Sequence, residues 1–160
     1  MTIARFDRVP PEQFQSDAAH LTAPLAVSDI PLPVRATAGS AGYDFVCPAE
    51  VTLLPGESVV IPTGARAFME PGWVLLIFPR SGLGFKHHLH LANTTGVIDS
   101  DYVNASNSGH IMVKVVNGSD HAFTLGRGER FCQGVFVPYG LAEESALPGE
   151  RSGGLGSTGR

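Results

Sequence analysis

The sequence lacks any apolar run long enough to cross a membrane, and its first residues lack the apolar core of a secretory signal. Charged residues are also few, at 16% of the 160 residues, and the net charge is −4. Proteins that bind nucleic-acid phosphates usually have a basic face, so the composition argues against a nucleic-acid partner as well as a membrane. A small anionic ligand needs only a few local cations and backbone amides, and it stays compatible with this composition.

Cysteine is scarce as well, and Cys47 and Cys132 both lie within apolar stretches. We expect two buried thiols in a reducing compartment rather than a disulfide, and therefore a cytoplasmic protein. A nucleophilic cysteine needs an activating partner, and the sequence shows none for Cys132.

Glycine (19) and proline (12) are abundant, which favours many short strands joined by turns. Eight short runs rich in β-branched and aromatic residues follow one another, with turn signals such as Pro55-Gly56 and Pro71-Gly72 between them. The runs are VTLL, SVVIPTG, ARAFM, WVLLIFP, TGVID, HIMVKVVN, HAFTL and RFCQGVFVPY. The pattern predicts one all-β domain, built as a sandwich, jelly roll or barrel.

The two ends of the chain differ from this central part. Residues 1–30 are predicted to be an N-terminal extension, in which PPEQFQSDAAH forms a helical turn or two, and residues 31–147 form the β domain. One short helix is predicted after Pro79, with Ser81 as its cap. Residues 148–160 contain five glycines and almost nothing apolar. They predict a flexible arm that orders only on a ligand or a neighbouring chain.

Five short segments combine groups that suit phosphate chemistry, although each alone is also compatible with an ordinary turn, cap or frayed end. They are AGYDF (41–45), PRSGLGFK (79–86), GVIDSDY (96–102), RGERFCQ (127–133) and RSGGLGSTG (151–159). Together they supply a helix start with a hydroxyl, a glycine-rich arm whose amides can approach phosphates, and local arginines. They also supply carboxylates able to hold Mg²⁺. These groups suit metal-assisted hydrolysis of a phosphate ester.

In this order and spacing the five segments resemble the signature motifs of the trimeric dUTP diphosphatase (dUTPase) family, from about Gly39 to the C-terminus. The resemblance implies a jelly-roll-like β-barrel and a homotrimer with active sites shared between subunits. It implies Mg²⁺-assisted hydrolysis of dUTP to dUMP and pyrophosphate, which limits uracil incorporation into DNA and supplies dUMP for thymidylate synthesis. The arm, residues 148–160, would close a site formed by the other two subunits.

The same resemblance implies a role for individual residues. Asp99 is the general base that orients water for in-line attack on the α-phosphorus. Asn93 and the backbone nearby read the uracil edge, in a hairpin too narrow for a 5-methyl group or an exocyclic amine. Tyr102 packs under the deoxyribose, where a 2′-hydroxyl would clash, and Asp44 lies near the water shell of the metal. The other substrate-binding residues implied are Arg80, Ser81, Gly82, Gly96, Val97, Ile98, Gln133, Arg151, Leu155, Gly156, Ser157 and Thr158.

Three features depart from the family pattern. Leu155 stands where most members have an aromatic residue that stacks on the uracil, and the lost stacking costs about 1–3 kcal/mol of base binding. The interval from Arg151 to Leu155 is one residue shorter than expected. The segment VNASNS separates Tyr102 from Gly109, where members have a short link.

Other interpretations remain open at this point. A zinc site at His87, His88 and His90 is disfavoured, because no fourth ligand completes it. A dCTP deaminase, or a bifunctional deaminase–diphosphatase, on the same fold would release ammonia from dCTP, but the signature region of the deaminases is absent. A non-catalytic nucleotide-binding protein would explain Leu155 and the long loop, but not an intact Asp99. A structural jelly roll would leave the glycine-rich arm without a role.

Overall fold

The structure is a computed structural model, and it describes residues 2–143. The strands are β1 (Ala4–Arg8), β2 (Val34–Arg35), β3 (Tyr43–Val46), β4 (Val51–Leu53), β5 (Ser58–Pro62), β6 (Ala65–Met69), β7 (Trp73–Pro79), β8 (Leu89–Leu91), β9 (Gly96–Ile98), β10 (Met112–Asn117), β11 (Phe123–Leu125) and β12 (Arg130–Pro138). The helical elements are α1 (Pro11–Asp17), α2 (Ser81–His87) and the 3-10 turns η1 (Val27–Asp29) and η2 (Tyr102–Asn104). The all-β prediction is confirmed, and each of the eight apolar runs contains a strand.

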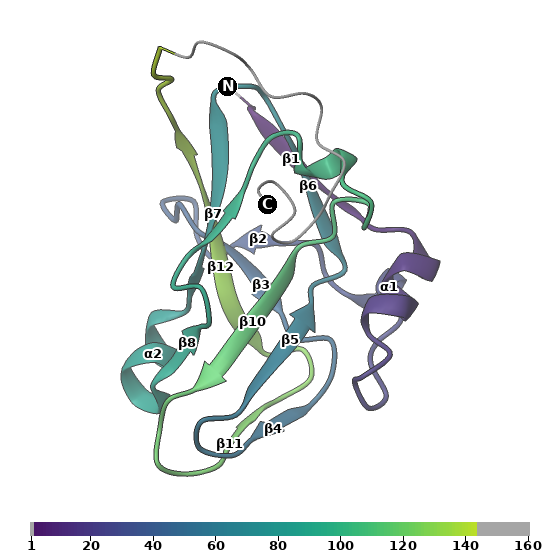
Figure 1. The fold of residues 1–160 in the computed structure, drawn as a ribbon, viewed down its shortest axis with the longest axis vertical. Coiled ribbons are helices and arrows are strands. Elements are labelled where there is room, and N and C mark those ends of the chain that lie inside the picture. Colours follow the sequence, from purple (N-terminus) through teal and green to yellow (C-terminus); the bar gives the residue numbers. More distant parts are fainter. Residues whose placement is uncertain (1, 144–160) are drawn as a thin grey trace.

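The strands form antiparallel sheets that enclose one interior (Figure 1). The largest sheet has the order β2-β3-β12-β7-β9, and β5-β10-β8 forms a second sheet. The pairs β1-β6 and β11-β4 complete the fold. Every paired strand runs antiparallel to its neighbour. This arrangement is the jelly-roll-like barrel that was expected.

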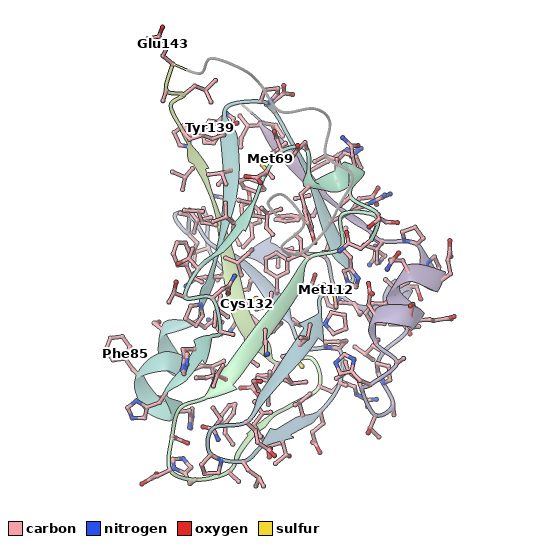
Figure 2. All side chains as sticks on the ribbon, viewed as in Figure 1. Met69, Phe85, Met112, Cys132, Tyr139 and Glu143 are labelled. Atoms are coloured by element: carbon pink, nitrogen blue, oxygen red, sulfur yellow. The ribbon has the colours of Figure 1, made fainter. Side chains whose placement is uncertain are left out.

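The main core lies between the two larger sheets, because alternate residues of each strand point inward. On β7, Leu75 and Ile77 are almost fully buried, and Val113 and Val115 are buried on β10. Cys132 lies in the same cluster on β12 (Figure 2). The described part of the chain, residues 2–143, contains no helix long and apolar enough to span a membrane.

The first thirty residues pack onto this barrel. Strand β1 pairs with β6 over its whole length, from Ala4 opposite Met69 to Arg8 opposite Ala65. Behind it, a smaller buried cluster forms between α1 and η1; it consists of Val9, Phe14, Ala18, Val27 and Ile30. Helix α1 begins at Pro11, in agreement with the predicted helical turn, because proline suits the first helical position.

Helix α2 and the strand that follows it differ in two details from the sequence-based expectation. Ser81 is its first helical residue and Arg80 occupies the cap position without a side-chain cap hydrogen bond, so the prediction that Ser81 caps the helix is wrong. The helix ends at His87, because His88 adopts a left-handed conformation (φ 51°) and donates its backbone N–H to the Gly84 carbonyl. The next three residues form strand β8, which the sequence did not predict.

Candidate active site

Asp44 is the centre of a charged cluster at one end of the main sheet. Its side chain is only 8% exposed on β3, yet it carries a carboxylate. Arg80 Nε lies 3.1 Å from its Oδ1, and Arg130 Nη1 lies 3.1 Å from its Oδ2. Two arginines therefore compensate one nearly buried carboxylate and are held in place by it.

Gln133 lies beside this cluster. It is opposite Asp44 in the β12–β3 pairing and opposite Phe78 in the β12–β7 pairing. A Cβ at Gly42 would lie 2.4 Å from Gln133 Oε1, so the glycine of AGYDF leaves the space that this side chain occupies. The first, second and fourth motifs thus meet at one end of β12 and β7.

Ser81 and Gly82 open helix α2 directly after Arg80, and both are exposed. A Cβ at Gly82 would meet nothing within 4 Å, so the space beside the helix start is open. Phe85, further along α2, is 87% exposed and points away from the barrel (Figure 2). Of the residues predicted for the phosphate side, Arg80, Ser81, Gly82 and Gln133 lie close together along the chain or across the sheet.

Arg130 belongs to this cluster, although the sequence analysis did not identify it as a site residue. It stands within RGERFCQ, but its pairing with Asp44 depends on how β12 aligns with β3. That register contains an irregularity between Arg130 and Cys132, which no local pattern predicts.

The third motif forms edge strand β9 and the turn after it. Gly96 lies against β7, and a Cβ there would meet Ile77 Cβ at 3.1 Å. Val97 is 60% exposed, whereas Ile98 is buried, as expected for alternate residues of an edge strand. Asn93 precedes the strand and is exposed. Its backbone carbonyl accepts one hydrogen bond from the Thr94 hydroxyl and one from the Thr95 backbone N–H.

Asp99 follows β9 directly and is exposed. It borders a surface cavity of about 530 Å³ whose walls are largely apolar. The lining residues are Val74, Leu76, Val97, Asp99, Ser100, Asp101 and Tyr139. The carboxylate therefore sits at the rim of a hollow large enough for part of a nucleotide-sized ligand.

Tyr102 is only 6% exposed and lies in the turn beyond Asp99. Its hydroxyl donates a hydrogen bond to the His110 carbonyl at 3.1 Å and accepts one from Asn107 Nδ2 at 2.9 Å. Core packing therefore holds the Tyr102 ring, and two hydrogen bonds hold its hydroxyl.

Within one chain, Asp99 and the Asp44 cluster are far apart. Ile98 pairs with Leu75 near one end of β7, and Arg80 follows the other end. At about 3.3 Å per residue, Leu75 and Arg80 are about 16 Å apart, and Asp99 lies one residue further from Arg80. The structure thus brings together Asp44, Arg80 and Gln133, but it separates them from Asp99 and Tyr102.

Five predicted site residues lie outside the described residues. They are Arg151, Leu155, Gly156, Ser157 and Thr158. The boundaries of the arm, residues 148–160, and of the β domain at residue 147 also fall there.

Among residues 2–143, no three His, Cys, Asp or Glu side chains are grouped so as to hold a metal ion. His87 packs against the Phe123 ring, with 4.7 Å between ring centroids. Burial, together with the nearby Asp44 charge, raises the pKa of the Cys132 thiol well above its usual value, and burial raises the pKa of Cys47 to about 11. Both cysteines are free, buried thiols, which are poor nucleophiles in the protonated form.

Comparison with known proteins gives a consistent result. The chain matches the dUTPase family model over residues 28–159. The deoxyuridine 5′-triphosphate nucleotidohydrolase of Lactococcus lactis subsp. lactis is 44% identical over 133 residues, which cover 81% of this chain and 89% of that protein. The enzyme of the same name from Hahella chejuensis is 44% identical over 140 residues, which cover 82% and 89% of the two chains.

Solved structures of similar proteins have the same fold. The dUTPase of Streptococcus mutans superposes with a TM-score of 0.68 at 36% identity and covers 87% of this chain and 98% of its own. A mutant dUTPase from phage phi11 of Staphylococcus aureus, described as coordinating a structural Mg(II) ion, gives a TM-score of 0.68 at 21% identity over 94% of this chain. At that identity the phage protein is evidence for the fold alone.

Proposed function

Since the chain belongs to the dUTPase family and is a dUTP diphosphatase, we propose that Asp99 directs a water molecule onto the α-phosphorus of dUTP. The water oxygen forms the new bond to phosphorus, and its proton passes to the Asp99 carboxylate. The bond from the α-phosphorus to the α–β bridging oxygen breaks, and pyrophosphate leaves with that oxygen. The exposed position of Asp99 at the rim of a cavity supports this role.

The observation that carries the proposal is the separation of the motifs along β7. Arg80 and Ser81 directly follow β7 at Pro79, whereas Asp99 lies near the opposite end of the strand. A triphosphate bound near Arg80 is therefore out of reach of the same chain's Asp99. We propose that a second copy supplies Asp99 and that the protein is a homotrimer whose active sites lie between subunits.

On the phosphate side, the proposed groups are Arg80, Ser81 and Gln133. Asp44 supports this assignment, because its ion pair at 3.1 Å keeps the Arg80 guanidinium in a defined orientation. A preformed cation needs little reorganisation when the triphosphate binds and when charge develops on the leaving group. Gly82 leaves open space at the helix start, where a phosphate oxygen can approach the backbone.

Mg²⁺ is the proposed cofactor, and it would withdraw negative charge from the triphosphate when bound. Both Asp44 oxygens face arginines, and residues 2–143 offer no carboxylate cluster for a metal. This donor set agrees with an ion that is chelated mainly by the substrate's phosphates and keeps most of its water, as Mg²⁺ prefers. Asp44 would contact such an ion only through water.

On the nucleoside side, Asn93 and the β9 backbone are proposed to read the uracil edge, and Tyr102 to pack under the deoxyribose. The edge position of β9 supports this assignment, because its outer backbone groups are available to pair with a base. The arm residues Arg151, Leu155, Gly156, Ser157 and Thr158 are proposed to close over the nucleotide. The free, buried cysteines accord with a cytoplasmic enzyme.

The test is pyrophosphate release from a panel of nucleotides. The purified protein is expected to cleave dUTP in preference to dTTP, dCTP and UTP, and a chelator is expected to stop the reaction. Release of ammonia from dCTP would indicate a deaminase instead. Binding of dUTP without pyrophosphate release, with Mg²⁺ supplied, would indicate a protein that only binds the nucleotide.

A further inference from the structure

The loop after Tyr102 folds back onto the tyrosine hydroxyl. Asn107 Nδ2 donates one hydrogen bond to Tyr102 Oη at 2.9 Å and another to the His110 carbonyl at 3.2 Å. The Tyr102 hydroxyl donates to the same carbonyl at 3.1 Å. The phenol, the amide and the carbonyl therefore form a closed triangle of hydrogen bonds.

The orientation of the Asn107 amide follows from its surroundings. A rotated amide would place Oδ1 against the His110 carbonyl, where two acceptors repel each other. In the present orientation Oδ1 is buried and has no hydrogen-bond partner among the described residues. The side chain thus gives up one hydrogen bond in order to make the two that hold Tyr102 and His110.

The carbonyl that receives these bonds is itself firmly fixed. The His110 side chain is fully buried, and its Nδ1 lies 2.6 Å from Asp17 Oδ2 on helix α1. Its Nε2 accepts the Gly64 backbone N–H at 2.9 Å, so the ring proton is on Nδ1 and points to Asp17. The N-terminal segment therefore anchors the residue on which Tyr102 and Asn107 converge.

The return of the loop is also constrained. Gly109 has a φ of +70°, and a Cβ there would lie 2.6 Å from Val103 Cα and 3.1 Å from the Tyr102 carbonyl oxygen. Only glycine satisfies both conditions. The extra segment between Tyr102 and Gly109 is therefore packed tightly against the residue that it follows.

We propose that Asn107 is a positioning residue, which fixes the Tyr102 ring and thereby sets the discrimination between deoxyribonucleotides and ribonucleotides. The inference rests on the proposed function, in which the Tyr102 ring packs under the deoxyribose and leaves no room for a 2′-hydroxyl. The Tyr102 ring packs in the main core, and the bond from Asn107 adds a second contact at Oη beside the His110 carbonyl, which fixes the tilt of the ring more tightly than packing and one hydrogen bond alone. The extra loop, VNASNS, then helps to exclude UTP by supplying Asn107.

The test compares kcat/KM for dUTP and for UTP in four proteins: the unaltered chain, Asn107→Leu, Tyr102→Phe and the double variant. Leucine has nearly the shape of asparagine but donates no hydrogen bond, and phenylalanine keeps the ring but loses Oη. Each single variant is expected to lower the dUTP/UTP ratio by about tenfold, mainly through a lower KM for UTP. The double variant is expected to fall no further than Tyr102→Phe, because the loss of Oη already removes the bond by which Asn107 acts on the ring.

Asn104→Ala is the matched control, since Asn104 lies in the same loop and is exposed. It is expected to leave the ratio unchanged. An Asn107→Leu protein that folds and keeps the full ratio would overturn the inference, as would an equally large effect of Asn107→Leu in the Tyr102→Phe background. If Asn107→Leu does not fold, Tyr102→Phe alone decides, and an unchanged ratio there overturns the inference. Failure of the unaltered chain to cleave dUTP would instead count against the proposed function.

Discussion

The two ends of strand β7 differ in how far one chain alone fixes the side chains that surround them. Beyond Pro79, Asp44 holds Arg80 and Arg130 by two ion pairs of 3.1 Å, and Gln133 fills the space beside Gly42. At the other end, Val97 on edge strand β9 and Asp99 directly after the strand are exposed beside a largely apolar cavity. The first end is preorganised by its own chain, whereas the second is the end that we propose serves a substrate bound to another copy of the chain.

Loss of Asp99 is expected to have the largest effect. Asp99→Asn keeps the size of the side chain but removes the proposed base, so kcat should fall by about 10³-fold while dUTP still binds. Single-turnover hydrolysis and equilibrium binding of dUTP measure the two quantities. Asp101→Asn, two residues further along, removes a charge from the same turn and should cost less than about tenfold. Equal losses in the two variants would show that the turn needs only negative charge.

Deletion within the arm, residues 148–160, tests whether the site around Asp99 must be closed for catalysis. Deletion of residues 153–160 should lower kcat/KM for dUTP by about 10²-fold, because the outer phosphates lose their contacts and water is no longer excluded. The melting temperature should stay unchanged. A truncated protein that melts early, or one that retains full activity, would contradict the proposed role of the arm.

Asp44→Ala tests the preorganised end. The change leaves Arg80 and Arg130 without their carboxylate, and since their side chains are 35% and 49% exposed, water relieves part of the cost. We expect a loss of about 1–3 kcal/mol in the free energy of unfolding and about tenfold in kcat/KM. Asp7→Ala is the matched control, because its ion pair with Arg66 is longer, at 3.5 Å, and more exposed. It should cost less than about 1 kcal/mol.

The smallest expected effect is a dependence of the free energy of unfolding on pH, caused by His110, the residue whose carbonyl accepts a hydrogen bond from the Tyr102 hydroxyl. Burial lowers the pKa of His110, and the Asp17 carboxylate only partly offsets this. The unfolded chain therefore takes up this proton at a higher pH than the folded chain. The contribution of His110 is fully present above about pH 6.5 and is lost as the pH falls below that value toward the folded-state pKa.

Denaturant titrations across this pH range measure the effect. Asp17→Asn should steepen the loss of stability, because it removes the group that favours the charged imidazole. A His110→Gln protein should lack this component of the pH dependence. If the two variants and the unaltered chain share one slope between pH 5 and 7, another group titrates there.

The sequence predicted the strands well where alternation was strong, as in β7, β10 and β12. It did not predict β8, because the alternation of Leu89, His90 and Leu91 covers only three residues and the helix end before it depends on the left-handed conformation of His88. The motifs identified Asp44 and Arg80, but not the ion pair of Asp44 with Arg130, which lies 86 residues further along the chain. Such contacts depend on strand register, which the whole barrel sets.

The loop after Tyr102 shows the same limit. The sequence revealed its extra residues, but not that Asn107 returns to Tyr102 or that His110 reaches Asp17, 93 residues earlier in the chain. The N-terminal segment was predicted as an extension from its weak apolar pattern. Its contacts with the barrel include the pairing of β1 with β6 and the hydrogen bond of Asp17 with one buried histidine, and neither leaves a periodic signal.

The most direct test of the account is restoration of activity from two inactive chains. Asp99→Asn and Arg80→Ala should each be nearly inactive alone, because each damages a different end of β7. Coexpressed in equal amounts, they should regain about a quarter of the activity, since random assembly pairs an intact Arg80 end with an intact Asp99 end at about one site in four. A mixture no more active than its components would contradict a site shared between copies of the chain.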